Sequence, residues 1–137
     1  MTQDAFFTLH KDLICKGSGE AADVDWACKI VGAPTSARTC EVACGSGGHI
    51  AALLAAAPEG AVRAIDKHAV FVRVASETYT SDARVQVSTG DVADLGGSFD
   101  LIWCASAVYF LGVTKALTLW RHHRDEFGYL LSVVRPI

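Results

Sequence analysis

Apolar runs and stretches of alternating polarity divide the chain into segments with strand or helix periodicity. The predicted strands are 38–43, 61–66, 84–88, 99–104 and 129–134. The predicted helices are one that follows Ser18 and Glu20 and ends at Gly32 and Pro34, and then 48–57, 68–78 and 113–124. Strands that alternate with helices are typical of a parallel sheet. We therefore predict an α/β fold with a doubly wound, mostly parallel sheet of about five strands.

Two segments carry a burial prediction. The run 99–104 is almost wholly apolar, which is typical of a central parallel strand buried on both faces. The helix 48–57 is rich in alanine on nearly every side and is predicted to pack against the sheet. The helical pattern of the first helix runs through Ala22, Trp26, Ala27, Ile30 and Val31.

Composition and charge narrow the class of protein. The chain has 137 residues, of which 51% are hydrophobic, and a net charge of −3. We expect one globular domain over 1–137, with a helical segment at 1–37 and an α/β core at 38–137. No basic arm indicates nucleic acid or an acidic membrane, and the longest apolar run, 50–58, is too short to span a bilayer. An odd number of cysteines, 5, without a C-x-x-C pair favours reduced thiols and a cytoplasmic location over disulfides or zinc.

A glycine-rich turn follows the first predicted strand, in the sequence Glu41-Val42-Ala43-Cys44-Gly45-Ser46-Gly47-Gly48. Asp66 ends the next strand, about 20 residues further on. Glycine is needed where a ligand approaches the backbone closely, because a Cβ would collide or forbid the required φ. The spacing predicts a nucleotide-type cofactor across the turn, with its ribose held by the carboxylate.

Four segments are predicted to meet in the crevice at the carboxyl ends of the strands, where open α/β sheets bind ligands. They are 43–48, 66–67, 90–92 and 104–106. Each segment alone would be a weak signal. Their convergence is what favours a binding site.

These segments resemble the motifs of class I S-adenosylmethionine-dependent methyltransferases. The matching residues are Glu41 to Gly48, Ala64-Ile65-Asp66, Thr89-Gly90-Asp91-Val92 and Phe99-Asp100-Leu101-Ile102, in the family's order. The resemblance runs from about residue 38 to the end of the chain. It implies a Rossmann-like methyltransferase fold and S-adenosyl-L-methionine as the cofactor.

The resemblance also implies roles for single residues. The turn residues Ala43, Cys44, Gly45 and Gly47 would contact the methionine and ribose parts, and Glu41 would orient the methionine end. Asp66 would hold the ribose hydroxyls, while Gly90, Asp91 and Val92 would lie beside the adenine. Lys67 and Cys104 complete the predicted cofactor contacts.

Structural interpretations of the same residues stay open. Glu41 could instead pair with Arg38 or Arg63, and Asp66 could cap the helix 68–78. Asp91 could end a strand and cap a turn. Cys44 is interpreted as a small buried thiol rather than a reactive one, because nothing in the sequence pairs with it.

Methyl transfer needs alignment more than acid–base chemistry, because the sulfonium already activates the leaving group. A general base is optional, and the weak candidates are His10 and Tyr109. For His49 a cofactor-side contact or a helix-surface position is expected. His122 and His123 are interpreted as solvated helix-end residues.

The sequence departs from the family pattern in three places. Ala43 stands where the family has its first glycine, which is tolerable if its φ is negative. The turn before the predicted fifth strand reads Asp125-Glu126-Phe127-Gly128, where the family has a sequence close to Pro-Gly-Gly. The given sequence ends at Ile137, after the predicted fifth strand, and we therefore expect a sheet without the family's last two strands. An uncovered strand edge invites pairing with another chain, and a homodimer through this edge is therefore a candidate assembly.

The function predicted from these observations is transfer of a methyl group to a small-molecule acceptor. One alternative is a degenerate S-adenosylmethionine-binding domain without activity. A less favoured alternative is an NAD(P)-binding oxidoreductase, because Ile50 occupies the place of the third glycine of that motif.

Overall fold

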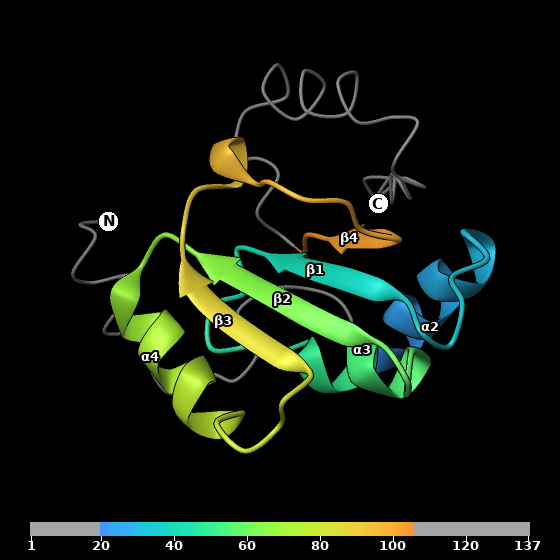
Figure 1. Cartoon of the computed structure of the whole chain (residues 1–137), viewed down its shortest axis with the longest axis horizontal. Coiled ribbons are helices and arrows are strands. Elements are labelled where there is room, and N and C mark those ends of the chain that lie inside the picture. Colours follow the sequence, from blue (N-terminus) through green and yellow to red (C-terminus); the bar gives the residue numbers. More distant parts are fainter. Residues whose placement is uncertain (1–19, 106–137) are drawn as a thin grey trace, which may run out of the picture.

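The computed structural model describes residues 20–105 of the chain (Figure 1). In this part the elements are, in order, α2 (Ala21–Ile30), β1 (Arg38–Val42), α3 (Ile50–Ala56), β2 (Ala61–Asp66), α4 (Ala69–Thr78), β3 (Val85–Thr89), the short 3₁₀ helix η1 (Val92–Asp94) and β4 (Leu101–Trp103). Strands and helices alternate, as the sequence pattern predicts. None of these helices is long and apolar enough to cross a bilayer.

The described strands form one parallel sheet in the order β3-β2-β1-β4. The chain runs outward from β1 through β2 to β3, and then places β4 on the other side of β1 (Figure 1). The order reverses between β1 and β4, and open α/β sheets bind their ligands at such a switch point. The predicted Rossmann-like α/β fold is confirmed. The predicted helix 113–124 and strand 129–134 lie outside the described residues, as does the edge predicted to pair with a second copy.

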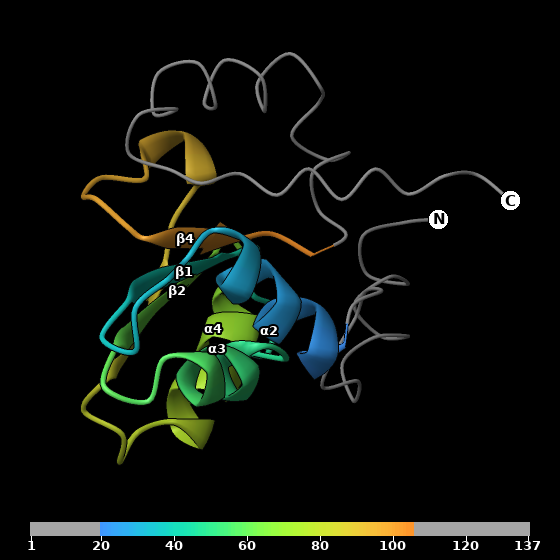
Figure 2. The ribbon, with the colours of Figure 1, turned by 90° about the vertical axis from the view of Figure 1, so that its right-hand side faces the viewer.

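Helices α2, α3 and α4 lie on one side of the described sheet, and η1 lies on the other (Figure 2). The core on the helix side joins residues of α2, α3, β2 and β4, namely Val24, Cys28, Ile50, Leu53, Leu54, Val62, Ala64 and Leu101, together with Cys44. The core on the opposite side joins Cys40, Val42, Ile65 and Phe99. Side chains of a strand alternate between its two faces, so the neighbouring residues Ala64 and Ile65 of β2 enter different cores.

Strand β4 is not central in the described sheet. It pairs with β1 alone among the described strands, while β1 and β2 take the inner positions. Leu101 is buried in the helix-side core, but Ile102 and Trp103 are half-buried. The prediction that this strand is central stays a prediction, because the strand predicted at 129–134 lies outside the described residues.

Helix α2 begins after Glu20, whose N–H donates to Asp23 Oδ2 at 2.8 Å in a capping box. Its buried residues are Val24, Ala27 and Cys28, at the spacing of one helix face. Trp26 and Ile30, which contributed to the sequence pattern, are instead exposed. Small buried residues allow α2 to pack closely on the sheet-bound helix α3.

Gly60 holds the starts of β1 and β2 together. A Cβ at this position would lie 2.1 Å from the carbonyl oxygen of Ala37, a distance that no side chain tolerates. The same oxygen accepts a hydrogen bond from Ala61 N at 3.1 Å. Only glycine allows the two chain segments to pass at this distance.

We predict that Gly60→Ala destabilises the domain by about 1–3 kcal/mol, the scale of overpacking in a core. Gly96→Ala is the matched control, because a Cβ there meets nothing within 4 Å. Urea unfolding of both variants measures the effect. Equal stability of the two variants would contradict the close approach of Gly60 and Ala37.

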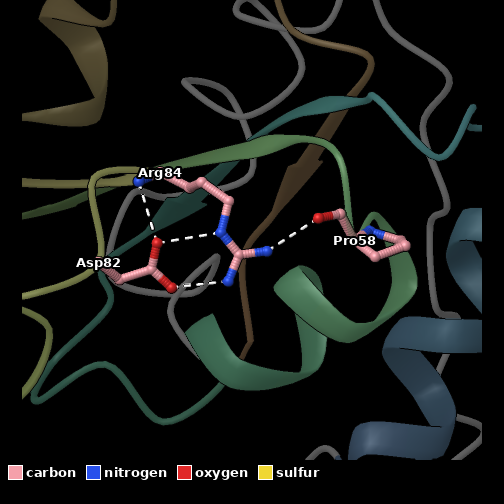
Figure 3. A network of polar contacts seen from close by, with 3 residues as sticks. All are labelled: Pro58, Asp82 and Arg84. Carbon is pink, nitrogen blue, oxygen red and sulfur yellow. Dashed lines mark hydrogen bonds and ion pairs between the residues drawn. The ribbon is translucent and has the colours of Figure 1, made fainter.

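The amino ends of the strands carry an exposed polar network (Figure 3). Arg84 pairs with Asp82 at 2.7 Å and donates to the carbonyl of Pro58 at 2.9 Å. The pairing lowers the pKa of Asp82 and raises the pKa of Arg84. Because both side chains face solvent, the network contributes little to stability, and it lies at the end of the sheet remote from the switch point.

Candidate functional site

The turn between β1 and α3 lies at the carboxyl end of the sheet, beside the switch point. Three of its residues have positive φ: Ala43 at 54°, Gly45 at 53° and Gly47 at 87°. At Gly47 a Cβ would also lie 2.8 Å from Ile50 Cδ1 and 3.3 Å from the Tyr79 ring. The backbone conformation therefore favours glycine at Gly47, and the neighbouring side chains leave little room for a Cβ.

Ala43 is the one non-glycine residue with positive φ among residues 20–105. The condition of a negative φ, under which an alanine would be tolerable at this position, is not met. The left-handed conformation brings the Cβ of an L-residue close to the next carbonyl oxygen, at a cost of roughly 1–2 kcal/mol. Ala43 is exposed, so the strain is set by the path of the turn and not by burial of its methyl group.

Asp66, at the end of β2, binds the first part of the turn, at Gly45. Its Oδ2 accepts from Gly45 N at 2.9 Å, and its Oδ1 accepts from His68 N at 2.8 Å. The side chain is buried, with 6% exposure. The contact to Gly45 joins the turn after β1 to the end of β2. Asp66 therefore does more than cap the helix that follows it, which was the alternative that the sequence left open.

Glu41, on β1, binds the last residue of the turn, His49. Its Oε1 accepts from His49 N at 3.2 Å and lies 3.4 Å from His49 Nδ1. The alternative partners Arg38 and Arg63 are wrong: the guanidinium of Arg38 lies over the Phe99 ring, and Arg63 donates to a main-chain carbonyl. His49 is buried, so the expected helix-surface position is also wrong.

The two acids place negative charge in a buried environment. Burial raises the pKa of Glu41; the contacts with His49 oppose this shift, and the nearby Asp66 adds to it. Burial likewise raises the pKa of Cys44, and the charges of Glu41 and Asp66 raise it further. The Cys44 thiol is therefore neutral, consistent with the interpretation as a small buried thiol.

The end of β3 joins the same site through the backbone. Gly90 N donates to the carbonyl oxygen of Asp66 at 3.0 Å. Asp91 is exposed and caps η1, with its Oδ1 accepting from Ala93 N at 2.9 Å. The turn-capping interpretation of Asp91 thus holds, and a carboxylate with one such bond can accept others.

The remaining predicted residues are placed less centrally. Lys67 is exposed, while Val92 and Cys104 pack against the core on the side of the sheet opposite the helices. His10 and Tyr109 lie outside the described residues. Within residues 20–105 no three His, Cys, Asp or Glu side chains gather into a metal-binding group.

The sequence interpretation missed Trp103 and the contact between His49 and Glu41. His49 lies against Glu41, and its ring centroid is 5.6 Å from that of Trp103 on β4. The signal for His49 was available, because a buried strand acid needs hydrogen-bond donors from the turn that follows it. No such signal existed for Trp103, since its position depends on the pairing of β4 with β1.

Comparison with known families decides the class of the domain. A methyltransferase-domain model matches residues 40–125, which is more than half of the chain. The chain belongs to the methyltransferase-domain family. The resemblance to class I S-adenosylmethionine-dependent methyltransferases is confirmed, and an NAD(P)-dependent oxidoreductase is not favoured. No curated protein matches the chain significantly.

Solved structures share the fold of this methyltransferase domain. A SAM-dependent methyltransferase from Thiobacillus denitrificans, in complex with S-adenosyl-L-homocysteine, is 20% identical with a TM-score of 0.64, over 88% of this chain and 50% of that one. YjhP from E. coli is 16% identical with a TM-score of 0.68, over 85% and 49%. A SAM-dependent methyltransferase from Aquifex aeolicus is 22% identical with a TM-score of 0.57, over 66% and 51%. The chain thus spans about half the length of these structures.

The strained turn of the methyltransferase domain yields one prediction. Ala43→Gly should raise the free energy of unfolding by about 0.5–1 kcal/mol, because relief of left-handed strain exceeds the entropy that glycine adds to the unfolded chain. Ala55→Gly, at an exposed position of α3, is the control and should lower stability by about 0.5–1 kcal/mol. Urea unfolding distinguishes them; a loss of stability in both variants would contradict the strain at Ala43.

The buried carboxyl group of Glu41 yields a prediction about the pH dependence of stability. Because the folded-state pKa of Glu41 is raised, the folded state binds more protons than the unfolded chain above the ordinary Glu pKa of about 4.3. Stability should therefore fall as the pH rises through this window. Glu41→Gln should be more stable than the wild type by roughly 1–3 kcal/mol at pH 8, with the gap closing toward pH 4. If the difference in unfolding free energy between Glu41→Gln and the wild type were the same at pH 4 and pH 8, the raised pKa of Glu41 would be contradicted.

Proposed function

We propose that this domain binds S-adenosyl-L-methionine and transfers its methyl group to a small-molecule acceptor. The observation that carries the proposal is the pair of buried carboxylates, Asp66 and Glu41, that hold a glycine turn beside the switch point of the sheet. The family match supports methyl transfer. Two structures of similar fold were crystallised with S-adenosyl-L-homocysteine, the demethylated form of S-adenosyl-L-methionine, and they support this choice of cofactor.

Asp66 is proposed to hold the ribose. A carboxylate has about four acceptor sites, and the described contacts use one on each oxygen, to Gly45 and His68. The remaining sites suit two vicinal hydroxyls. The same two contacts fix the carboxylate before a ligand arrives, so that little conformational freedom is lost on binding.

Glu41 is proposed to serve the methionine end. Its Oε2 is buried and has no hydrogen-bond partner in the described structure, whereas Oε1 is held by His49. A buried, unpaired carboxylate oxygen is costly, and a cationic ligand group would relieve that cost. Gly90 and Asp91, which the backbone contact to Asp66 brings close, are proposed for the adenine side.

When bound, the cofactor would supply a methyl group on a sulfonium ion that is already activated for displacement. The chain's own residues would align the acceptor atom with this group and exclude water, and such alignment can account for most of the acceleration. His10 and Tyr109 stay the candidates for a base, where the acceptor has a proton to lose.

Asp66→Ala tests the ribose assignment. It should weaken binding of S-adenosylhomocysteine by about 1–3 kcal/mol, because the lost hydrogen bonds involve a charged group. Asp82→Asn removes one charge at the remote end of the sheet and should bind as the wild type does. Calorimetric titration measures both variants.

Unchanged affinity in a folded Asp66→Ala variant would contradict the assignment. Titration of the wild type with NAD is the second arm, and binding of NAD without S-adenosylhomocysteine would overturn the proposed function. Binding of S-adenosylhomocysteine without methyl transfer to a broad acceptor panel would retain the cofactor and remove the catalytic claim.

A further inference from the structure

Within residues 20–105, two buried polar atoms near the switch point have no hydrogen-bond partner: Glu41 Oε2 and Trp103 Nε1. One is an acceptor that can carry charge, and the other is a donor only. Glu41 and Trp103 are register partners on the parallel strands β1 and β4. Paired residues of adjacent strands present their side chains on the same face of the sheet. The side chains that carry the two unpaired atoms are therefore neighbours on the sheet.

His49 completes this group, which we call the Glu41–His49–Trp103 cluster. It binds Oε1 of Glu41, and its ring packs at 5.6 Å and 60° against Trp103. These contacts restrict both side chains while leaving Oε2 and Nε1 without partners. A buried donor and a buried acceptor that stay unpaired each cost about 1–3 kcal/mol, so an arrangement that keeps both favours a ligand that pairs with both.

The cluster lies where a ligand is expected. Glu41 precedes the last residue of β1, and Trp103 is the last residue of β4. The strand order reverses between these two strands. Crevices at such reversals are the binding sites of open α/β sheets.

We propose that Trp103 is a cofactor-binding residue, with its indole N–H donating to the carboxylate of the methionine end while Glu41 Oε2 accepts from the α-ammonium group. The inference rests on the proposed function. An amino-acid zwitterion carries one acceptor group and one cationic donor group, which matches the two unpaired atoms in kind and in number. Trp103 thereby recognises the part of the cofactor that a plain nucleoside lacks.

The electrostatics of the site support this polarity. Glu41 and Asp66 are close enough that the charge of Asp66 opposes ionisation of Glu41. Two carboxylates that share a buried region attract a cation, which the ammonium group provides. The uncharged indole N–H then serves the ligand's anionic group, which would be repelled by either acid.

A comparison of two ligands tests the proposal on the full chain. S-Adenosylhomocysteine carries the amino-acid end, and 5′-methylthioadenosine has the same adenosine and sulfur without it. In Trp103→Phe, affinity for S-adenosylhomocysteine should fall about tenfold, while affinity for 5′-methylthioadenosine stays unchanged. Trp26→Phe is the matched control, because Trp26 is exposed on α2, and it should alter neither affinity.

Equal losses for both ligands, or no loss, would overturn the proposal in favour of a structural tryptophan or of a buried water that bridges Glu41 and Trp103. Failure of the wild type to bind either ligand would instead remove the proposed function, and the two failures are thus distinguishable.

If Trp103→Phe does not fold, ¹⁵N-indole spectra of the wild type provide the readout. The Trp103 signal, assigned through Trp26→Phe and Trp120→Phe, should move with S-adenosylhomocysteine and not with 5′-methylthioadenosine. An equal chemical-shift change with both ligands, or no change with either, overturns the assignment of Trp103 to the amino-acid end.

Discussion

Two buried carboxylates hold the glycine turn at its two ends, and the rest of the site depends on them. Asp66 accepts from Gly45 N, and Glu41 accepts from His49 N. Because the acids sit on neighbouring strands, they fix the turn to the sheet rather than to itself. The turn then follows a left-handed path through Ala43, Gly45 and Gly47, and α3 begins only after His49.

The same arrangement has a cost to stability that suggests its purpose. A buried acid with one unpaired oxygen would be replaced by an apolar side chain if packing were the only demand. Burial raises the pKa of Glu41 and so disfavours its ionised form. Ala43 is strained as well, because its backbone is in the left-handed region. Strain and unpaired charge that gather at one sheet end are characteristic of binding sites, where a ligand compensates them.

The elements that depend on local periodicity were predicted well. Strand β2 has the predicted limits, and α4 begins one residue after the prediction, because His68 caps it. Helix α3 is shorter than 48–57, because the turn uses Gly48 and His49 to reach Glu41. Apolar alternation and glycine punctuation carry this information in sequence, whereas hydrogen bonds from a turn back to a strand do not.

The parts that depend on strand pairing could not be predicted. The apolar run that contains β4 indicates a buried strand, but it does not state that this strand pairs with β1. The proximity of Trp103 to Glu41 follows from the register of β4 on β1 and has no trace in either segment alone. The conformation of Ala43 was likewise outside sequence reasoning, since residue type favours negative φ and the two anchored ends of the turn override it.

Hydrogen exchange measured by mass spectrometry, on the wild-type chain with and without S-adenosylhomocysteine, tests the central claim most directly. The claim is that the turn held by two acids is the cofactor site. The account predicts added protection in the peptides that contain 43–49, 66–68 and 90–94, with little change at the remote strand ends near Asp82 and Arg84. Saturation with the ligand that leaves the turn peptides unprotected, or protects other segments alone, would contradict it.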